Sequence, residues 1–368
     1  MAGIYIHIPF CRSRCIYCGF YSTTALELRQ HYVDAVCREV EMRGGRKEEL
    51  PRITTVYLGG GTPSQLTIAQ LSQVFDAVYK YNKVDADAEV TIEVNPDDVT
   101  AEFVEGLRQL PVNRISMGVQ TFDDERLRWL HRRHTSQQVA QAVAHLRAAG
   151  IGNISIDLMY GFTNESIDTW DYDITRGLAL QPEHISAYCL MIEEGTPLHR
   201  LSVQPVDEEL ERAMYYHLID RLEAAGFEHY EISNFARKGF RSRHNSNYWN
   251  QTPYIGIGAA AHSYDLLTRS WNVSDIARYI EGIEHGERIF DFETLDADTR
   301  YNDLVATALR TCEGIDLGTL SPTHRDYCSK SARRFISDGL LQLCGSRLAL
   351  TRRGLFVSDM VMADLMKV

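Results

Sequence analysis

Three cysteines lie within eight residues near the start of the chain. Cys11, Cys15 and Cys18 follow a predicted strand at residues 3–8 and have the spacing C-x3-C-x2-C. Three thiolates on one short loop can hold three of the four irons in a cubane of iron and sulfide, which leaves the fourth iron free for another ligand. The spacing therefore predicts a [4Fe-4S] cluster whose open iron binds a substrate or a cofactor.

Two other interpretations of the cysteine loop are weaker. A structural zinc site normally has four ligands in two paired knuckles, whereas this sequence has one trio and no second pair. Three buried structural cysteines do not suit the polar, glycine-containing loop CRSRCIYCGF. We expect the remaining cysteines to lie in the core, as small apolar side chains. These are Cys37, Cys189, Cys312, Cys328 and Cys344.

Strand-like and helix-like segments alternate through the first two-thirds of the chain. The predicted strands cover residues 3–8, 54–58, 89–94, 114–119, 153–159 and 184–191. The predicted helices cover residues 26–43, 68–81, 123–131, 136–149, 168–180 and 208–225. This alternation predicts an α/β fold with a parallel sheet. Six units are too few for a closed eight-stranded barrel, so we expect an incomplete, laterally open (β/α)6 barrel with its site at the carboxyl ends of the strands.

The pattern divides the chain into three parts. Residues 1–234 form the predicted partial barrel, and residues 235–293 form a connecting segment rich in Gly, Asn, Ser and aromatic residues. Residues 294–368 are mainly helical, with a hairpin signal around Cys344-Gly345-Ser346 and a predicted terminal helix over residues 351–366, which favours a small winged-helix-like domain. A packing or lid role suits this domain better than DNA binding, because the whole chain is acidic.

Longer motifs extend the pattern of the cysteine loop. C-x3-C-x2-C after a first barrel strand is the signature of the radical S-adenosylmethionine (SAM) superfamily. The strings YIHIPFCRSRCIYCGFYS, GGGTPS, NRISMGVQTF, DLMYG and HNSNYW resemble oxygen-independent coproporphyrinogen III oxidase and its relatives. The oxidase motif continues to a fourth cysteine, where this sequence has Phe20. HemW-type haem chaperones share that departure and the motif HNxxYW, so the sequence resembles this family most.

The resemblance implies a SAM-binding pocket at matching motif positions. These are Tyr5, Tyr17, Gly61, Thr62, Glu93, Gln120, Arg132 and Asp157. The amino and carboxylate groups of SAM would chelate the open iron, and Gly61 would let the backbone approach the ligand closely. Glu93 would pair with the SAM ammonium, and Tyr17 would lie beside the adenine.

The remaining SAM positions each have an alternative. Gln120 and Asp157 suit the ribose diol, although Asp157 is also compatible with a structural salt bridge. Arg132 suits the SAM carboxylate, because its guanidinium offers a fork of donors. In the alternative interpretation, Arg132 is a solvated charge on a helix surface. The neighbouring Arg133 is a second candidate for the same role. The glycines of GGGTPS are also compatible with a plain strand-to-helix turn.

A histidine in the connecting segment is the haem candidate. His244 opens the motif HNSNYW, imidazole is a good axial ligand for haem iron, and Tyr248 and Trp249 offer aromatic surface for a porphyrin. In the competing interpretation, His244 caps a turn while the two aromatic residues pack between domains. His262, in AAAHSY, is a weaker candidate.

The resemblance implies a haem chaperone that passes haem to an acceptor haem protein, with SAM and the cluster in a structural or regulatory role. The first alternative is oxidative decarboxylation of coproporphyrinogen III, and the second is another radical SAM reaction on a tetrapyrrole. Whether the protein is an enzyme stays open at this point, since the motifs that imply the cofactors do not require SAM cleavage.

The charge and the apolar pattern of the sequence limit which partners the protein can bind and where in the cell it can lie. With 38 Lys and Arg against 50 Asp and Glu, the formal net charge is −12, which disfavours nucleic acid. No apolar run is long enough to span a membrane, and the start of the chain lacks a secretory signal, so we expect a cytoplasmic protein. A homodimer is possible.

Overall fold

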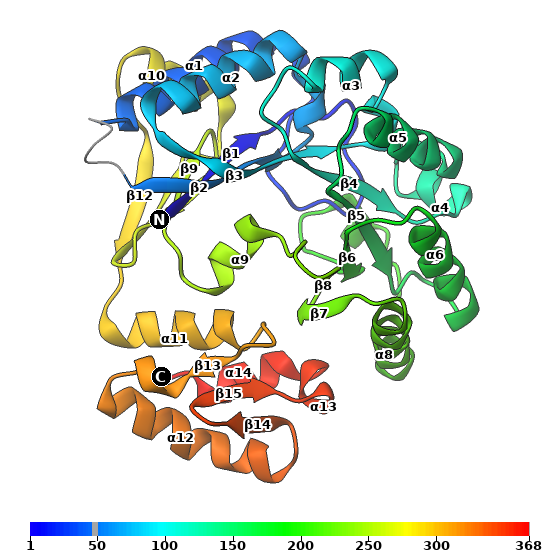
Figure 1. The fold of residues 1–368 in the computed structure, drawn as a ribbon, viewed down its shortest axis with the longest axis vertical. Coiled ribbons are helices and arrows are strands. Elements are labelled where there is room, and N and C mark those ends of the chain that lie inside the picture. The colour runs from blue at the N-terminus through cyan, green and yellow to red at the C-terminus, as the bar shows by residue number, and fades with distance from the viewer. Residues whose placement is uncertain (46–50, 368) are drawn as a thin grey trace.

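The computed structural model describes residues 1–45 and 51–367 and is drawn in Figure 1. The predicted ranges 1–234 and 294–368 include residues 46–50 and 368, which lie outside the described residues. The larger sheet has twelve strands in the order β12-β11-β10-β9-β1-β2-β3-β4-β5-β6-β8-β7. Among the described residues, no helix is long and apolar enough to cross a membrane.

Six parallel strands form the centre of this sheet. They are β1 (Ala2–Ile8), β2 (Arg52–Gly60), β3 (Lys83–Val94), β4 (Arg114–Gln120), β5 (Ile154–Tyr160) and β6 (His184–Cys189). Each pairs in parallel with the next, but β1 and β6 do not pair with each other. The structure therefore confirms the incomplete, laterally open barrel.

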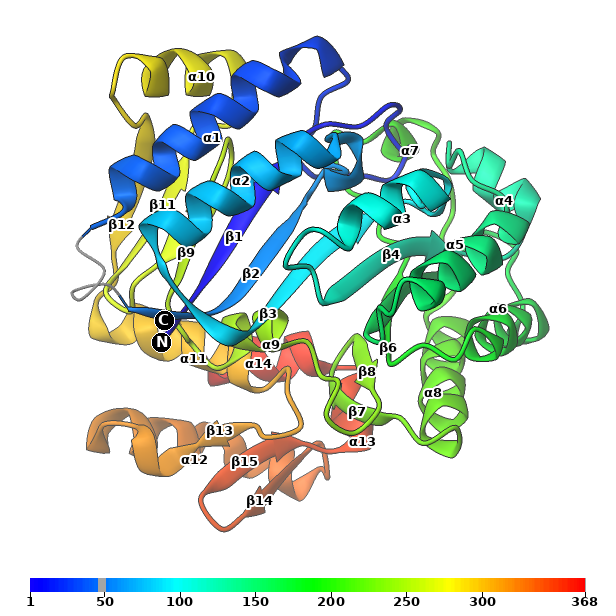
Figure 2. The same cartoon turned by 45° about the horizontal axis from the view of Figure 1, so that its top comes forward.

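Helices cover the outer face of these strands (Figures 1 and 2). They are α1 (Arg29–Arg43), α2 (Ile68–Tyr81), α3 (Ala101–Leu107), α4 (Asp124–Trp129), α5 (Ser136–Ala148), α6 (Ile167–Ala179) and α8 (Glu208–Ala224). The short helix α7 (Pro197–Arg200) instead packs against the loop after β1, through Leu198 and Ile16. Short 3-10 turns η1 (Leu26–Leu28), η2 (Pro63–Gln65) and η3 (Pro96–Asp98) precede α1, α2 and α3. Capping boxes start α2, α5 and α6. The predicted starts match α2 and α5 and fall one residue late for α6.

The two faces of the barrel strands differ in polarity. On β1, Ile4, Ile6 and Ile8 are buried in the apolar core beneath the helices. The alternate residues Tyr5 and His7 face the barrel interior, where their side chains bond to each other. The helix face therefore supplies the packing, while the inner face presents polar groups.

The predicted connecting segment widens the sheet. Its elements are β8 (Asn234–Ala236), α9 (Arg243–Trp249), β9 (Tyr254–Ile257), β10 (His262–Tyr264), β11 (Thr268–Asn272), α10 (Ile276–Glu284) and β12 (Phe290–Thr294). The first of these strands starts one residue before the predicted range 235–293, and the last ends one residue after it. The short strand β7 (Glu228–Glu231) precedes it. Because β9 pairs in parallel with β1, the sheet continues past the barrel through β10, β11 and β12. These strands were not predicted, since three to five residues with Gly, Asn and Ser give no clear alternation.

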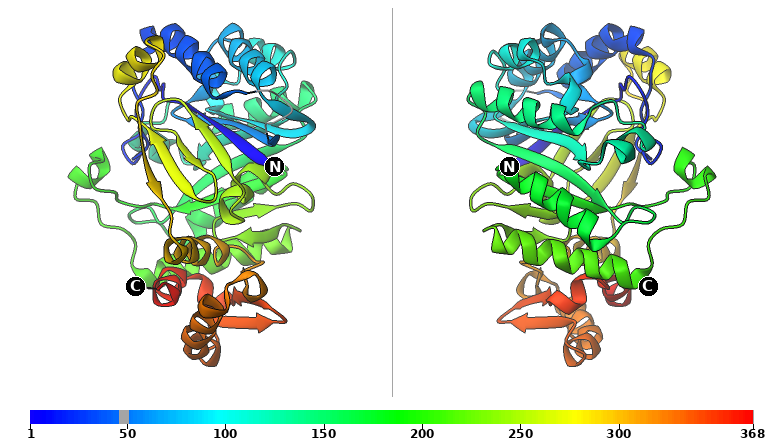
Figure 3. Two further views of the ribbon diagram at one scale, coloured as in Figure 1. Left: turned by 90° about the vertical axis from the view of Figure 1, so that its left-hand side faces the viewer. Right: turned by 90° about the vertical axis from the view of Figure 1, so that its right-hand side faces the viewer.

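The C-terminal part has a core of its own. It contains α11 (Ala297–Ala308), β13 (Ile315–Asp316), η4 (Leu317–Thr319), α12 (Pro322–Ser337), β14 (Leu341–Cys344), β15 (Arg347–Leu350), α13 (Arg352–Leu355) and α14 (Ser358–Leu365). Figure 3 shows it at one end of the molecule. The hairpin β14–β15 and the helices confirm the small winged-helix-like domain.

Two finer expectations for this domain are wrong. One continuous terminal helix was expected, but α13 ends at Leu355 and α14 starts at Ser358. Cys328 is buried as expected, whereas Cys312 and Cys344 are exposed. Cys344 ends β14 on the exposed side of the hairpin, so the apolar pattern around it did not indicate burial.

Candidate functional site

The cysteine loop follows β1 at the carboxyl end of the barrel. The backbone N–H of Cys11 donates to the carbonyl of Thr23 at 2.9 Å, which turns the loop back on itself. Ile16 is buried in a small apolar cluster with Leu130 and Leu198, separate from the main core. Its carbonyl accepts from Leu198 N at 2.8 Å, and its N–H donates to Leu130 O at 3.3 Å. Two other segments of the barrel mouth therefore hold the loop in place.

Each thiol is partly exposed, and two have specific neighbours. The Sγ of Cys11 lies 3.6 Å from the Thr62 hydroxyl, and the Sγ of Cys15 lies 3.6 Å from Nη1 of Arg132. Burial raises the pKa of Cys11 and of Cys18. In the part of the chain that the structure describes, no group of three or more His, Cys, Asp or Glu side chains is arranged to hold a single metal ion.

The glycine turn after β2 packs tightly against β1. Gly60 has a φ of +112°, and a Cβ there would lie 2.4 Å from the His7 ring. A Cβ on Gly61 would lie 2.7 Å from the Pro9 carbonyl carbon. Glycine is therefore required for the close approach of the two strand ends. The next residue, Thr62, is buried and accepts a hydrogen bond from Asn95 Nδ2 at 3.3 Å.

Two carboxylates lie on the inner face of β3 and β5. Glu93 accepts from the Tyr57 hydroxyl at 2.7 Å and from Gly60 N at 3.1 Å, and burial raises its pKa to about 7. Asp157 accepts from the Ser116 hydroxyl at 3.4 Å, and burial raises its pKa to about 6. No ion pair joins Asp157 to a described cation. Both carboxylates therefore keep capacity for a cationic or hydroxyl-bearing ligand.

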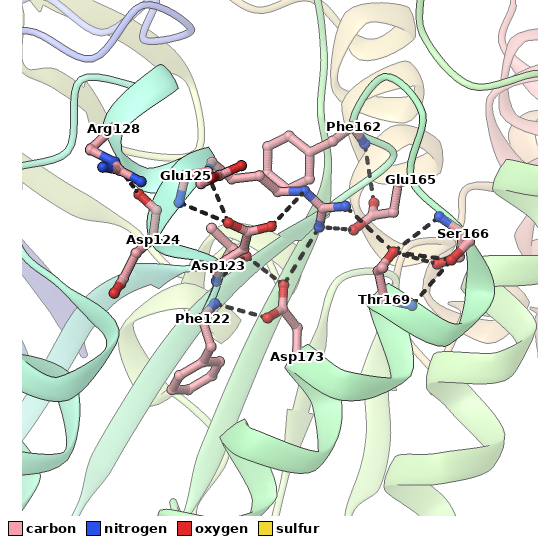
Figure 4. Close-up of polar contacts among 12 residues, drawn as sticks. Phe122, Asp123, Asp124, Glu125, Arg128, Phe162, Glu165, Ser166, Thr169 and Asp173 are labelled. Atoms are coloured by element: carbon pink, nitrogen blue, oxygen red, sulfur yellow. Dashed lines mark hydrogen bonds and ion pairs between the residues drawn. The ribbon is translucent and has the colours of Figure 1, made fainter.

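Gln120 ends β4 in a left-handed conformation with a φ of +70°. The pairing of β4 with β5 shifts register between Gly118 and Gln120. A network anchored on Asp173 of α6 holds the backbone just beyond this point (Figure 4): its carboxylate accepts from the Thr121 hydroxyl at 2.6 Å and from Phe122 N at 2.8 Å. Asp173 is buried, and its two hydrogen bonds hold the turn that directly follows Gln120.

Arg126 completes this network. Its Nη1 contacts Glu165 Oε1 at 2.5 Å and lies 3.9 Å from Asp173 Oδ2. Glu165 also accepts from Gly161 N at 2.7 Å and from Phe162 N at 3.1 Å (Figure 4). The guanidinium of Arg126 thus contacts the two carboxylates that hold the turns after β4 and β5.

Two neighbouring arginines have different surroundings. Arg132 donates to Asn95 Oδ1 at 2.7 Å and to the Gly118 carbonyl, while its buried Nε has no partner. Arg133 pairs instead with Asp97 at 2.7 Å and Asp98 at 3.0 Å. Arg132 therefore faces the cysteine loop, and Arg133 is neutralised by two carboxylates.

The two candidate tyrosines lie on either side of this site. The Tyr5 hydroxyl is 3.0 Å from Nδ1 of His7, whose Nε2 is 2.9 Å from the Tyr21 carbonyl. Tyr17 lies in the cysteine loop, and burial raises the pKa of its phenol while the nearby Arg132 lowers it. The predicted positions thus lie on the barrel strands and on the loops after them, with Tyr5 and Asp157 at the middle of β1 and β5.

His244 lies in the barrel interior and not on an accessible surface. Its side chain is buried, with Nδ1 2.8 Å from Thr55 Oγ1 and Nε2 3.0 Å from the Tyr248 hydroxyl. The ring stacks on Tyr57 with centroids 5.0 Å apart. Burial lowers the pKa of His244 to about 3. Coordination of haem by His244 would require the hydrogen bond at the coordinating nitrogen to break and the buried ring to become accessible, so this placement favours the structural interpretation of the motif.

Two residues of the interior were missed as candidates. Asn95 connects Thr62 to Arg132, and its place directly after a predicted strand was the available signal. The guanidinium of Arg114 is only 1% exposed, and its Nε and Nη1 have no partner. A charged residue at the start of an apolar strand was the corresponding signal for Arg114.

Comparisons with known proteins agree with this architecture. Residues 5–175 match the radical SAM superfamily, and residues 295–357 match the HemN C-terminal domain. A protein described as heme chaperone HemW from Mycobacterium tuberculosis is 35% identical over 375 residues, which covers 99% of this chain and 94% of that protein. The chain belongs to the HemW family of the radical SAM superfamily.

Two further similarities support the HemW assignment and the fold. HemW from Bacillus subtilis is 35% identical over 86% of this chain and 85% of its own length. The structure of coproporphyrinogen III oxidase (HemN) from Escherichia coli superposes with a TM-score of 0.86, covering 100% of this chain and 90% of that one. At 21% identity, this second likeness shows the fold alone. Membership of the radical SAM superfamily implies a [4Fe-4S] cluster and SAM as cofactors of the HemW family.

Proposed function

We propose that this protein is a haem chaperone, which binds haem and transfers it to an acceptor haem protein. The observation that carries the proposal is the identity to HemW of 35% over almost the whole length of both chains. The exposed Phe20 adds support, because the fourth cysteine expected of the oxidase motif is absent from this loop.

The cluster would be held by Cys11, Cys15 and Cys18. The donor set fits a cubane, since three partly exposed thiols share one loop at the carboxyl end of the barrel. A cluster held there would supply one-electron reduction to SAM bound beside it. The protein's own part is to place the ligands and to exclude water.

SAM would lie against the cluster among the carboxyl-terminal strand ends. The unpartnered Nε of Arg132 is an orphaned buried donor, which suits the carboxylate of SAM. Glu93 would bind the ammonium, and Gln120 with Asp157 would bind the ribose hydroxyls. The rest of the pocket would be lined by Tyr5, Tyr17, Gly61 and Thr62. The proposal also includes a cytoplasmic location.

A haemin titration tests the proposed function. Anaerobically reconstituted protein is titrated with haemin, the Soret band is followed, and SAM with a reductant is then added. A carrier gives a band that saturates near one haem per chain and survives the addition. No band, or a band that bleaches as 5′-deoxyadenosine accumulates, would contradict the carrier role. Coproporphyrinogen III and other tetrapyrroles would then be tested as substrates.

Replacement of the three loop cysteines by alanine tests whether they hold the iron–sulfur cluster. We expect this variant to lose the iron–sulfur absorption. If the absorption persists, the cluster is held elsewhere.

A further inference from the structure

A cavity of about 530 Å³ lies on the helix-covered face of the sheet extension, away from the proposed cofactor site. Ser263 of β10 lies opposite Ser270 of β11, which lies opposite Phe292 of β12, so these three side chains form a row on one face. The neighbouring Tyr264 pairs with Tyr254 and, through it, with the inner face of β1. Because successive residues of a strand point to opposite faces, the row lies on the outer face, where α1 and α10 lie side by side (Figure 2).

Two arginines line this cavity from the helix side. Arg43, the last residue of α1, donates to the Ser263 hydroxyl at 3.1 Å. Arg288, between α10 and β12, donates to the Ser270 hydroxyl at 3.4 Å and through Nε to the side-chain carbonyl of Asn272 at 2.6 Å. Nη1 of Arg288 and Nε of Arg43 have no hydrogen-bond partner among the described residues. Each guanidinium therefore keeps a free donor.

The two guanidiniums share a single carboxylate. Glu39 is fully buried and lies 3.3 Å from Nη1 of Arg43 and 3.6 Å from Nε of Arg288, and no other described carboxylate is within ion-pair distance of either arginine. Glu39 also accepts from the Asn272 side chain and from the Tyr279 hydroxyl. Burial and the neighbouring Arg43 lower the pKa of Arg288 to about 10. The positive charge at the cavity is therefore not fully compensated, which favours an anionic ligand.

The rest of the cavity wall is largely apolar. Phe290 and Phe292 are 43% and 64% exposed, so their rings are available to a ligand, and the Arg288 guanidinium lies 4.1 Å from the Phe290 ring centroid. Ile255 of β9 also lines the cavity. The carboxylate of Asp265 lies at the wall as well, but it accepts three hydrogen bonds from the two residues that follow in its own turn.

We propose that this cavity binds a carboxylate with an extended apolar body, of the fatty-acid type. The carboxylate would accept from the free donors of Arg43 and Arg288 and from the Ser270 hydroxyl, whose proton has no acceptor among the described residues. The apolar body would pack on Phe290 and Phe292. The volume of the cavity is in the range of small-molecule sites. Because the site lies on the outer face of the sheet, this proposal does not depend on the proposed haem function.

Calorimetric titration of the full chain with octanoate tests the site, and octan-1-ol serves as an uncharged ligand of the same length. We expect octanoate to saturate at roughly one molecule per chain and octan-1-ol to bind at least about tenfold more weakly, because it offers no charge to the guanidiniums. Each methylene removed from octanoate should weaken binding roughly threefold, since less apolar surface is buried. Equal affinities for the acid and the alcohol, or no saturable binding of octanoate, would overturn the proposal.

Two variants separate the charged end of the site from its apolar wall. Arg288→Met should weaken octanoate binding at least about tenfold and leave octan-1-ol binding unchanged. Arg269→Met is the matched control, because Arg269 precedes Ser270 on β11 and points to the opposite face, and it should bind octanoate as wild type does. Phe292→Ala keeps both guanidiniums and should weaken both ligands alike, so the test holds even if Arg288→Met does not fold. Equal losses in Arg288→Met and Arg269→Met, or no loss in Phe292→Ala, would contradict the proposed site.

The chain's own carboxylates are the competing occupant. Pro51 lines the cavity, and Glu48 and Glu49 precede it in the sequence. If octanoate binds only to Glu48→Gln/Glu49→Gln and not to wild type, the occupant is the chain itself and a separate ligand is excluded. Equal octanoate affinity in this variant and in wild type supports the proposal.

Discussion

The guanidinium of Arg132 lies 3.6 Å from the thiol of Cys15, measured from Nη1 to Sγ, although 117 residues separate them in the chain. The parallel barrel explains this proximity, because the segments after β1 and after β4 both emerge at the carboxyl end of the sheet. These two candidate cofactor-binding residues are thus brought together by topology and not by sequence spacing.

The two neighbouring arginines give a matched pair for testing the SAM site. We expect Arg132→Ala to weaken SAM binding by roughly 10–100-fold, since a buried charge-assisted contact to the carboxylate is worth about 1.5–3 kcal/mol. Arg133→Ala should change the affinity less than threefold, because Arg133 pairs with Asp97 and Asp98. Calorimetric titration of the reconstituted variants measures both. Equal losses in the two variants would argue against a direct role for Arg132.

The glycine turn after β2 makes a second prediction. Gly60→Ala should lower the free energy of unfolding more than Gly150→Ala does. The difference between the two variants should be about 1–3 kcal/mol. Both glycines have positive φ, so both alanines bear the backbone strain. Only at Gly60 does the added Cβ meet another group, the ring of His7 at 2.4 Å, whereas nothing lies within 4 Å at Gly150. Urea unfolding of the two variants measures the difference, and equal midpoints would mean that His7 moves aside without cost.

The barrel and the outer helices could be predicted because their local signals agree. The buried strands are long apolar runs, and α2 occupies Ile68–Tyr81 as expected because Thr67 and Gln70 cap it. The first part of β3 was missed, since Lys83 and its exposed neighbours read as a polar loop. Strands β9–β12 were missed for a different reason: each depends on pairing with a distant strand more than on its own residues.

The candidate site was predictable in its residue types but not in its contacts. The distinction between Arg132 and Arg133 depends on which side chain faces the interior, and two identical neighbours give no sequence signal for that. His244 looked like an accessible ligand because the motif is polar and aromatic, yet tertiary packing buries it against Thr55 and Tyr57. Burial of a polar group by distant segments is a property of the fold, which local pattern does not report.

A buried carboxylate at the junction with the C-terminal domain should make stability depend on pH. The backbone of Glu231 forms an isolated β-bridge with Thr311, and its carboxylate accepts from Asn234 Nδ2 and Ser233 N. Burial raises the pKa of this carboxyl from 4.5 to about 7. Between these two values the folded state holds a proton that the unfolded state has lost, so this group lowers the free energy of unfolding as pH rises. The stabilising contribution of Glu231 to the free energy of unfolding is on the order of 3 kcal/mol, and it is fully lost above about pH 7.

Glu231→Gln isolates this effect. Glu93 and Asp157 titrate in the same range, so the useful quantity is the difference in unfolding free energy between variant and wild type. We expect the unfolding free energy of the variant to increase relative to that of wild type as the pH rises from 5 to 8. Denaturant unfolding at both pH values measures this, and a difference that stays constant across the range would show that Glu231 titrates normally.

The network around Arg126 should be a major source of stability for the turns that position Gln120. Arg126→Met would leave Glu165 and Asp173 buried without their cation, since their side chains are 0% and 1% exposed. Removing one partner from a buried ion pair typically costs about 3–5 kcal/mol. Arg128→Met is the matched control, because Arg128 lies on the same helix and donates only to the Asp124 carbonyl at an exposed position. Arg128→Met should change the free energy of unfolding by no more than about 0.5 kcal/mol.

The double variant Arg126→Met/Glu165→Gln decides whether the cost of removing Arg126 is electrostatic. Neutralising Glu165 removes one of the two uncompensated carboxylates while keeping an acceptor for Gly161 N and Phe162 N. If the buried charge is the cause, thermal unfolding of the double variant should recover part of the stability lost in Arg126→Met. If the lost stability instead comes from the packing of Arg126 on the Phe162 ring, 5.1 Å from its centroid, the second substitution should give no recovery.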